Sequence, residues 1–287
     1  MKSNNPVFSR SEEFNRSGAN AYGNQTYAGG YGSDPSTWGT GTPGDTGDAG
    51  PQAPAAPMTI DSVVQKTSIT LGIVLVTAFA TWVLTPDLRD NTEAAGGLYL
   101  ALMIGSFGAF ALAMVNSFKK VVSPALVLAF AALEGVAMGA FSKFIEQTFV
   151  PQGSGSIVMQ AVIGTFAAFA GTLAAYKFFN IQVGNKFRTF VVAAMFGMVA
   201  LGLLEVVLGM FGNAMGFLGF GGLGLVFAIA GLVLGVFMLI LDFDFVEQGV
   251  ANRVPEQESW RAAFALTVSL VWIYTNLLRI LAILQND

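Results

Sequence analysis

Apolar residues occupy most of the chain in long stretches that short polar segments separate. After residue 58 such stretches recur seven times, each close to the ~20 residues that a helix needs to cross a bilayer. We place them at about 67–86, 96–117, 124–147, 157–178, 189–211, 219–242 and 261–284. They are too long and continuous for barrel strands, whose side chains alternate with a period of two. Because backbone polar groups in lipid must be satisfied within their own segment, the pattern predicts an all-α polytopic membrane protein with seven transmembrane helices.

Residues 1–57 lack this pattern and are rich in Gly, Ser, Thr, Asn, Asp and Pro. A segment of this composition buries too little apolar surface to offset its ordering entropy, so we predict a disordered cytoplasmic tail. Two roles stay open: a plain solvated tail, or a segment whose scattered Tyr and Gly residues bind other membrane proteins. The chain then divides into this tail and a transmembrane domain, residues 58–287, that opens with a short lead-in capped by Thr59 or Asp61.

Composition agrees with a membrane protein and excludes several chemistries. Apolar residues make up 54% of the 287 residues and charged residues only 11%, against about 25% charged in soluble domains. The chain has no cysteine and no histidine, which excludes thiolate nucleophiles, a Ser-His triad and His-ligated metals. We therefore expect no enzyme, no resident cofactor and no nucleic-acid partner. The expected partner is the bilayer, and an ion handled here would be a hard cation such as calcium, bound by oxygen.

Lysine and arginine predict the orientation. If the amino terminus is cytoplasmic, all but three of the 14 Lys and Arg residues lie on the inner side, and the exceptions are Arg89, Lys143 and Arg279. Positive residues favour the cytoplasmic face. The pattern predicts a multi-pass protein of the cell membrane with its carboxyl terminus outside.

Ionisable residues inside the spans are costly and therefore indicate function. Glu134 lies near the midplane, about 15 Å along the third span. It is either a neutral acid that is hydrogen-bonded to a neighbouring helix or part of an ion pathway. Glu205 lies about 25 Å along the fifth span, in the outer third. We expect it to pair with Arg279 or Lys143, which lie at similar depth.

Three acidic residues follow one another at the predicted inner end of the sixth span: Asp242, Asp244 and Glu247. Successive helical residues turn by about 100°, so Asp242 and Asp244 point to nearly opposite faces, and one of them should face the bundle. Asp244 and Glu247 share a face. With carbonyls and water these carboxylates are candidate calcium ligands; the alternative is simply a charged end of a span.

The inward aspartate needs a partner within the bundle. Lys119 and Lys120, at the inner end of the second span, lie at the right depth to hold it as a latch. The neutral donors of the seventh span at that depth are Thr267 and Ser269.

Several segments resemble the Bax inhibitor-1 family. The third span contains Glu134-Gly135, Gly139 and Ser142, which is similar to that family's E-G-x-x-x-G-x-x-S block. Gln160-Ala161, the Leu-Asp-Phe-Asp end of span six and the Leu-Leu-Arg-Ile-Leu run of span seven also fit. The resemblance covers about residues 60–285. The tail and the Asp-Phe-Asp-Phe-Val-Glu-Gln string look most like the family's actinobacterial branch.

This resemblance implies a seven-helix fold with a central last helix. It also implies, for some bacterial members, a pH-sensitive calcium leak gated by two aspartates in spans six and seven, and for others a regulator of membrane-protein quality control. Asp242 or Asp244 matches the first aspartate. The second is missing, because residues 262–286 contain no Asp or Glu. We expect a calcium or proton leak that membrane-embedded carboxylates control, with a non-conducting regulator that binds other membrane proteins as the alternative.

Overall fold

The structure is a computed structural model that describes residues 56–88, 94–151, 155–179 and 181–286. Within these residues it has seven helices, all long and apolar enough to cross a membrane. They are α2 (Ile60–Leu84), α3 (Ala94–Phe118), α4 (Pro124–Phe149), α5 (Ile157–Phe178), α6 (Asn185–Met210), α7 (Gly222–Ala251) and α8 (Glu258–Asn286). The same residues form no strand beyond one isolated bridge between Pro57 and Pro255. The predicted all-α, seven-span architecture is confirmed.

Two helix boundaries differ from the sequence prediction by well over a helical turn, the start of α2 and the end of α7. The predicted lead-in is the first part of α2, which begins at Ile60 with Thr59 as its N-cap in a capping box with Ser62. The sixth span does not end at Asp242, because α7 continues to Ala251. The acidic side chains from Asp242 onward suggested that the span ends at that residue, but both aspartates have partners on neighbouring helices. They therefore lie in the body of the helix.

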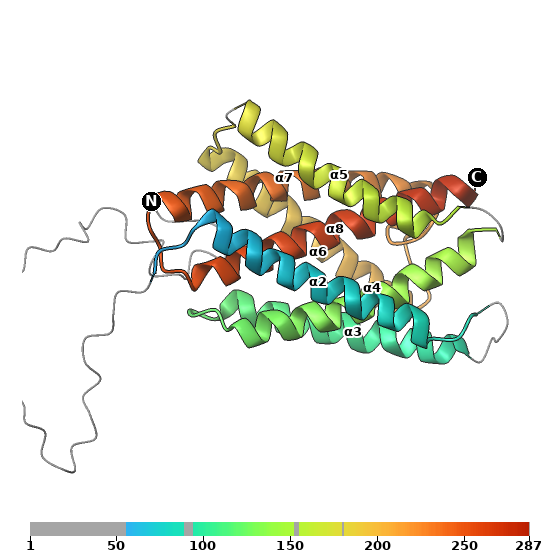
Figure 1. Ribbon diagram of the computed structural model, residues 1–287. Helices are drawn as coiled ribbons and strands as arrows, with labels where there is room; N and C mark the ends of the chain where they lie inside the picture. The colour runs from blue at the N-terminus through green and yellow to red at the C-terminus, as the bar shows by residue number, and fades with distance from the viewer. Residues whose placement is uncertain (1–55, 89–93, 152–154, 180, 287) are drawn as a thin grey trace, which may run out of the picture.

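The last helix is the centre of the bundle, as the resemblance implied. α8 packs against α2, α4, α5 and α7, and its span is the most buried of the seven. Figure 1 shows it running through the middle of the molecule. Small side chains such as Ala262, Ala263 and Ala282 are almost fully buried along it, which lets the surrounding helices approach closely.

Glycines set the close packing of α4 on its neighbours. A Cβ atom on Gly135 would overlap Thr77 Oγ1 and the Val74 carbonyl of α2. Gly139 lies against the backbone of α2 in the same way, one helical turn further along α4. The Glu-Gly-x-x-x-Gly spacing of the third span is therefore a helix-packing stripe.

In contrast, α6 lies at the edge of the bundle. Its span is the least buried of the seven, and α7 is the helix on which it packs. A small apolar cluster joins the two helices around Val191, Leu234 and Leu241.

The chain just before α2 packs on the α7–α8 loop. The Met58 N–H donates to the Val254 carbonyl at 2.7 Å, and the Glu256 N–H donates to the Ala56 carbonyl at 2.8 Å. Met58 is buried. Most of the predicted tail, residues 1–55, lies outside the described residues, but its last two residues belong to the folded part. Ala56 and Pro57, at the end of the predicted tail, therefore pair with the α7–α8 loop.

Candidate functional site

A buried carboxylate and a buried hydroxyl meet between the last two helices. Ser269 of α8 donates to Asp242 Oδ2 of α7 at 2.5 Å. Asp242 is 6% exposed and Ser269 is 0% exposed. Asp242 lies nine residues before the end of α7 at Ala251, about 14 Å along the helix. The inward aspartate is therefore held by a neutral donor, one of the two alternatives that the sequence left open.

A cavity of about 210 Å³ adjoins this pair. Residues of α3, α6, α7 and α8 line it, and Asp242 is the one ionisable residue among them. The hydroxyls of Ser117 and Ser269 are its other polar side chains. α3 and α6 flank the cavity without packing closely on each other. The carboxylate therefore adjoins free space beside the most loosely packed helix.

Asp244 points the other way, as the helical geometry predicted. Arg188 of α6 pairs with its Oδ2 atom at 2.6 Å, and Gln248 Nε2 donates to the same oxygen at 2.8 Å. The side chain is buried, so it does not reach the interface as a free charge. This ion pair joins the start of α6 to the last third of α7.

The predicted latch with Lys119 or Lys120 is wrong. Among the described residues, Asp242 is bonded to Ser269 and Asp244 to Arg188 and Gln248. The two lysines follow the end of α3, and their backbone carbonyls accept from Arg261 Nη2 at 3.5 and 2.7 Å. The segment that carries them is therefore held against α8 and not against the acidic face of α7.

The three predicted calcium ligands also separate. Glu247 accepts a hydrogen bond from the Tyr176 hydroxyl of α5 at 2.5 Å. Asp242, Asp244 and Glu247 thus face α8, α6 and α5 respectively. In the described part of the chain no group of three acidic side chains is placed to hold a metal ion. A shared face of one helix does not bring Asp244 and Glu247 together as metal ligands, because each of them contacts a side chain of a different helix.

Glu205 is buried near the α6–α7 loop, but the predicted ion pair is not there. Its carboxylate accepts from the backbone N–H groups of Met215 at 2.9 Å and Gly216 at 2.6 Å. Arg279 instead donates to the Phe217 carbonyl of the same loop at 2.8 Å. The two opposite charges therefore hold one loop through its backbone and do not pair with each other.

Lys143 has a similar role at the end of α2. Its ammonium donates to the backbone carbonyls of Trp82, at 2.9 Å, and Thr85. It also lies 3.3 Å from Asp87 Oδ1. The last carbonyls of a helix lack intrahelical partners, so a buried cation satisfies them. The prediction that Lys143 pairs with Glu205 is wrong for this reason.

Glu134 stands apart from these contacts. Its side chain is partly buried in α4, and no hydrogen bond of its carboxylate is found within the described residues. It does not line the cavity beside Asp242. The structure therefore does not bring Glu134 and Asp242 together at one site.

The comparison with protein families decides the identity. The family model described as Bax inhibitor 1 like matches residues 5–286, nearly the whole chain. The chain belongs to the Bax inhibitor-1-like family. The comparison with curated proteins gave no match. Together with the seven apolar helices, this makes the chain a multi-pass membrane protein of that family.

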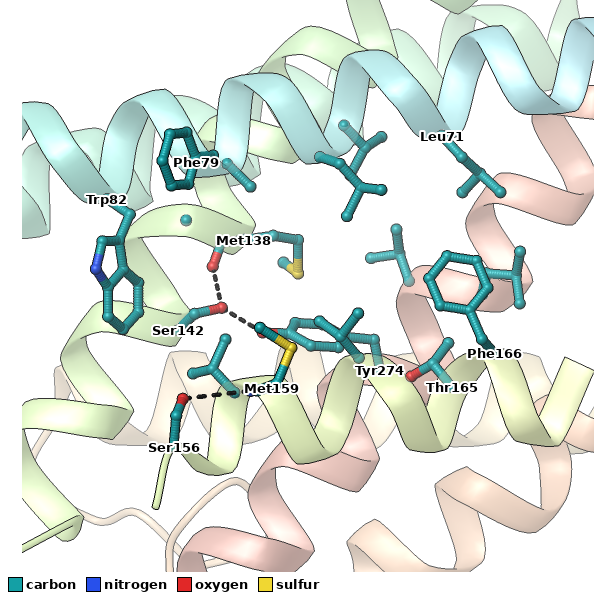
Figure 2. Close-up of a pocket in the computed structure, with 18 residues that line it drawn as sticks. Leu71, Phe79, Trp82, Met138, Ser142, Ser156, Met159, Thr165, Phe166 and Tyr274 are labelled. Atoms are coloured by element: carbon teal, nitrogen blue, oxygen red, sulfur yellow. Dashed lines mark hydrogen bonds between the residues drawn. The ribbon is translucent and has the colours of Figure 1, made fainter. Parts of the chain in front are cut away.

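This family member has a second, larger cavity of about 540 Å³ between α2, α4, α5 and α8. Its lining is almost entirely apolar (Figure 2). The Ser142 and Tyr274 hydroxyls at its floor share a hydrogen bond at 2.5 Å, and Ser142 also donates to the Met138 carbonyl. Ser142 is the serine of the block that resembles the Bax inhibitor-1 family, so that serine joins α4 to the central helix.

Two residues that contact acidic side chains of α7 were not predicted from the sequence, Arg188 and Tyr176. Arg188 was counted only as an inner positive charge, and Tyr176 was not considered. A signal for Arg188 was present: α6 and α7 are consecutive spans, so the start of one and the end of the other lie on the same side of the membrane. No comparable signal pointed to Tyr176, since α5 and α7 are not consecutive.

Proposed function

We propose that this Bax inhibitor-1-like protein is a pH-sensitive leak pathway for calcium or protons, and that Asp242 is the carboxylate that controls it. The observation that carries the proposal is the buried Asp242–Ser269 pair beside a cavity in which Asp242 is the one ionisable lining residue. An ionisable group at membrane depth is costly and usually marks an ion or proton path.

The chemistry of the site follows from its single charge. Ionised Asp242 places one negative charge beside the cavity and attracts a cation, whereas protonated Asp242 removes that attraction. Ser269 can donate to the carboxylate but cannot take up a second negative charge. A proton shared between two carboxylates is therefore not available, and the pH response belongs to one acid. No cofactor and no catalytic step are needed.

We also propose the orientation that the lysine and arginine distribution predicts, with the amino terminus in the cytoplasm and the carboxyl terminus outside the cell membrane. α2 begins and α8 ends at opposite ends of the bundle (Figure 1). In this orientation the Arg188–Asp244 pair lies on the cytoplasmic side. Asp242 lies deeper, closer to the cytoplasmic side than to the outer side.

Calcium flux into proteoliposomes between about pH 5 and pH 8 tests the proposal. The wild type should show a pH-dependent flux, and Asp242→Asn should remove the pH dependence because its amide does not titrate. The matched control is Asp61→Asn, an exposed aspartate in the first turn of α2, which should keep the wild-type profile. An Asp242→Asn protein with the wild-type profile would exclude Asp242 as the control.

Two further outcomes separate the alternatives. Glu134 remains the second candidate acid, so Glu134→Gln belongs in the same assay. If this variant alone flattens the profile, the pathway runs past α4 and not past the cavity beside Asp242. A wild type that conducts neither calcium nor protons at any pH would favour a non-conducting regulator that binds other membrane proteins.

A further inference from the structure

We infer that the larger cavity, between α2, α4, α5 and α8, binds one acyl chain of a membrane phospholipid that enters from the side, between α2 and α5. Both of these helices pack on α8, but they do not pack closely on each other. The gap between them is the cavity of about 540 Å³, within the ~300–1,000 Å³ of typical ligand sites.

The lining suits a hydrocarbon chain and not water. Its polar side chains are few, and the Ser142 and Tyr274 hydroxyls are bonded to each other. A water molecule needs two to four polar partners, which this cavity does not offer. Phe79 and Met159 on the two flanking helices are 70% and 60% exposed. Figure 2 shows these two side chains on facing helices of the cavity, where an acyl chain would cover them.

The length of the cavity favours one lipid chain over a transmembrane helix of another protein. Its lining runs from Leu71 to Trp82 on α2 and from Ser156 to Phe166 on α5. At 1.5 Å per residue these segments are about 17 Å and about 15 Å long. This is about half of the ~30 Å hydrocarbon layer, the depth of a single leaflet. A spanning helix would need a groove along the whole bundle.

One end of the cavity carries polar side chains and the other is chiefly apolar, which suits the polar head and the apolar tail of a lipid. Trp82 and Ser156 lie at one end, where α2 finishes and α5 begins. Tryptophan is enriched at the level of lipid headgroups, so the polar part of the lipid belongs at this end. The other end is lined chiefly by apolar side chains, Leu71 and Phe166 among them, and would hold the end of the chain.

Retention of lipid by the purified full-length protein tests the inference. After exchange into vesicles of dioleoyl phosphatidylglycerol and extraction into mild detergent, native mass spectrometry should show one retained phospholipid per chain. Val162→Phe fills the cavity from α5 and should weaken retention by about tenfold or more. The matched control is Ile163→Phe: Ile163 is 61% exposed and does not line the cavity, so its variant should retain the lipid as the wild type does.

Ala78→Leu fills the same cavity from α2 and decides the question if Val162→Phe does not fold. Thermal unfolding in detergent identifies a variant that has lost its fold. The inference is overturned if the wild type retains no phospholipid, or if the filling variants retain it as well as Ile163→Phe does. It is also overturned if the species retained in the wild type has the mass of a free fatty acid or of a polypeptide.

Discussion

Three of the buried carboxylates in the described residues have three different kinds of donor. Asp242 accepts from a hydroxyl, Asp244 from a guanidinium and an amide, and Glu205 from two backbone N–H groups. If a buried carboxylate loses its donors, or the donors lose the carboxylate, the free energy of unfolding falls. What each carboxylate contributes to stability therefore depends on the groups that donate to it more than on its position along the membrane normal.

Glu205 gives a prediction at this scale. Glu205→Ala leaves the N–H groups of Met215 and Gly216 without their acceptor, so we expect the free energy of unfolding to fall by about 1–3 kcal/mol. Glu205→Gln keeps one carbonyl acceptor and should lose less. Denaturant or thermal unfolding in detergent measures both variants. Equal stability of Glu205→Ala and the wild type would show that the carboxylate does not hold the α6–α7 loop.

At the scale of helices, the packing is uneven. α4 contacts α2 so closely that glycine is required at the crossing, whereas α6 is held chiefly by α7 and by the Arg188–Asp244 pair. Closely packed helices resist rearrangement, since protein interiors tolerate little overpacking. If a helix moves to open the cavity beside Asp242, α6 is the one with the fewest contacts to break.

Two glycine substitutions compare tight and open helix faces. Gly135→Ala places a methyl group against Thr77 and Val74, so we expect it to lower the free energy of unfolding by about 1–3 kcal/mol. Gly197 of α6 has no atom within 4 Å of the position where its Cβ would lie, so Gly197→Ala should leave stability nearly unchanged. Thermal unfolding of the two purified variants checks this, and equal effects would contradict the assigned α2–α4 crossing.

At the scale of the whole molecule, the described residues just before α2 pack on the loop that precedes the central helix. Ala56 and Met58 pair with the α7–α8 loop, and Lys66 reinforces this contact through Glu256 at 2.9 Å. The contact joins the start of the first span to the start of the central last helix.

Two deletions test where the folded part begins. Removing residues 2–55 should leave thermal stability in detergent nearly unchanged, because their composition cannot form a packed core. Extending the deletion through Met58 removes both backbone hydrogen bonds and the buried methionine, so we expect it to lower the free energy of unfolding by about 2–4 kcal/mol. A large loss from the shorter deletion would mean that the tail packs on the bundle.

The sequence by itself determined the class, the number of spans and most of their boundaries. Apolar stretches of spanning length leave the backbone no alternative to helices in lipid. The sequence also indicated which carboxylates lie at membrane depth and that Asp242 and Asp244 point apart, since both follow from helical geometry alone. The absence of Asp and Glu from residues 262–286 was likewise evident, and it left a neutral donor such as Ser269 as one of two possible partners for the inward aspartate.

Only the tertiary structure decided the partners. Asp244 pairs with Arg188 and not with Lys119 or Lys120, because α6 lies beside Asp244 and the segment after α3 does not. Glu205 accepts from the backbone of the α6–α7 loop and not from Arg279. The sequence could not indicate this, because a backbone donor does not depend on the side chain. α7 continues past Asp242, and its acidic residues there have partners on α8, α6 and α5. Each of these outcomes depends on which helices are neighbours, and periodicity along one chain segment carries no information about that.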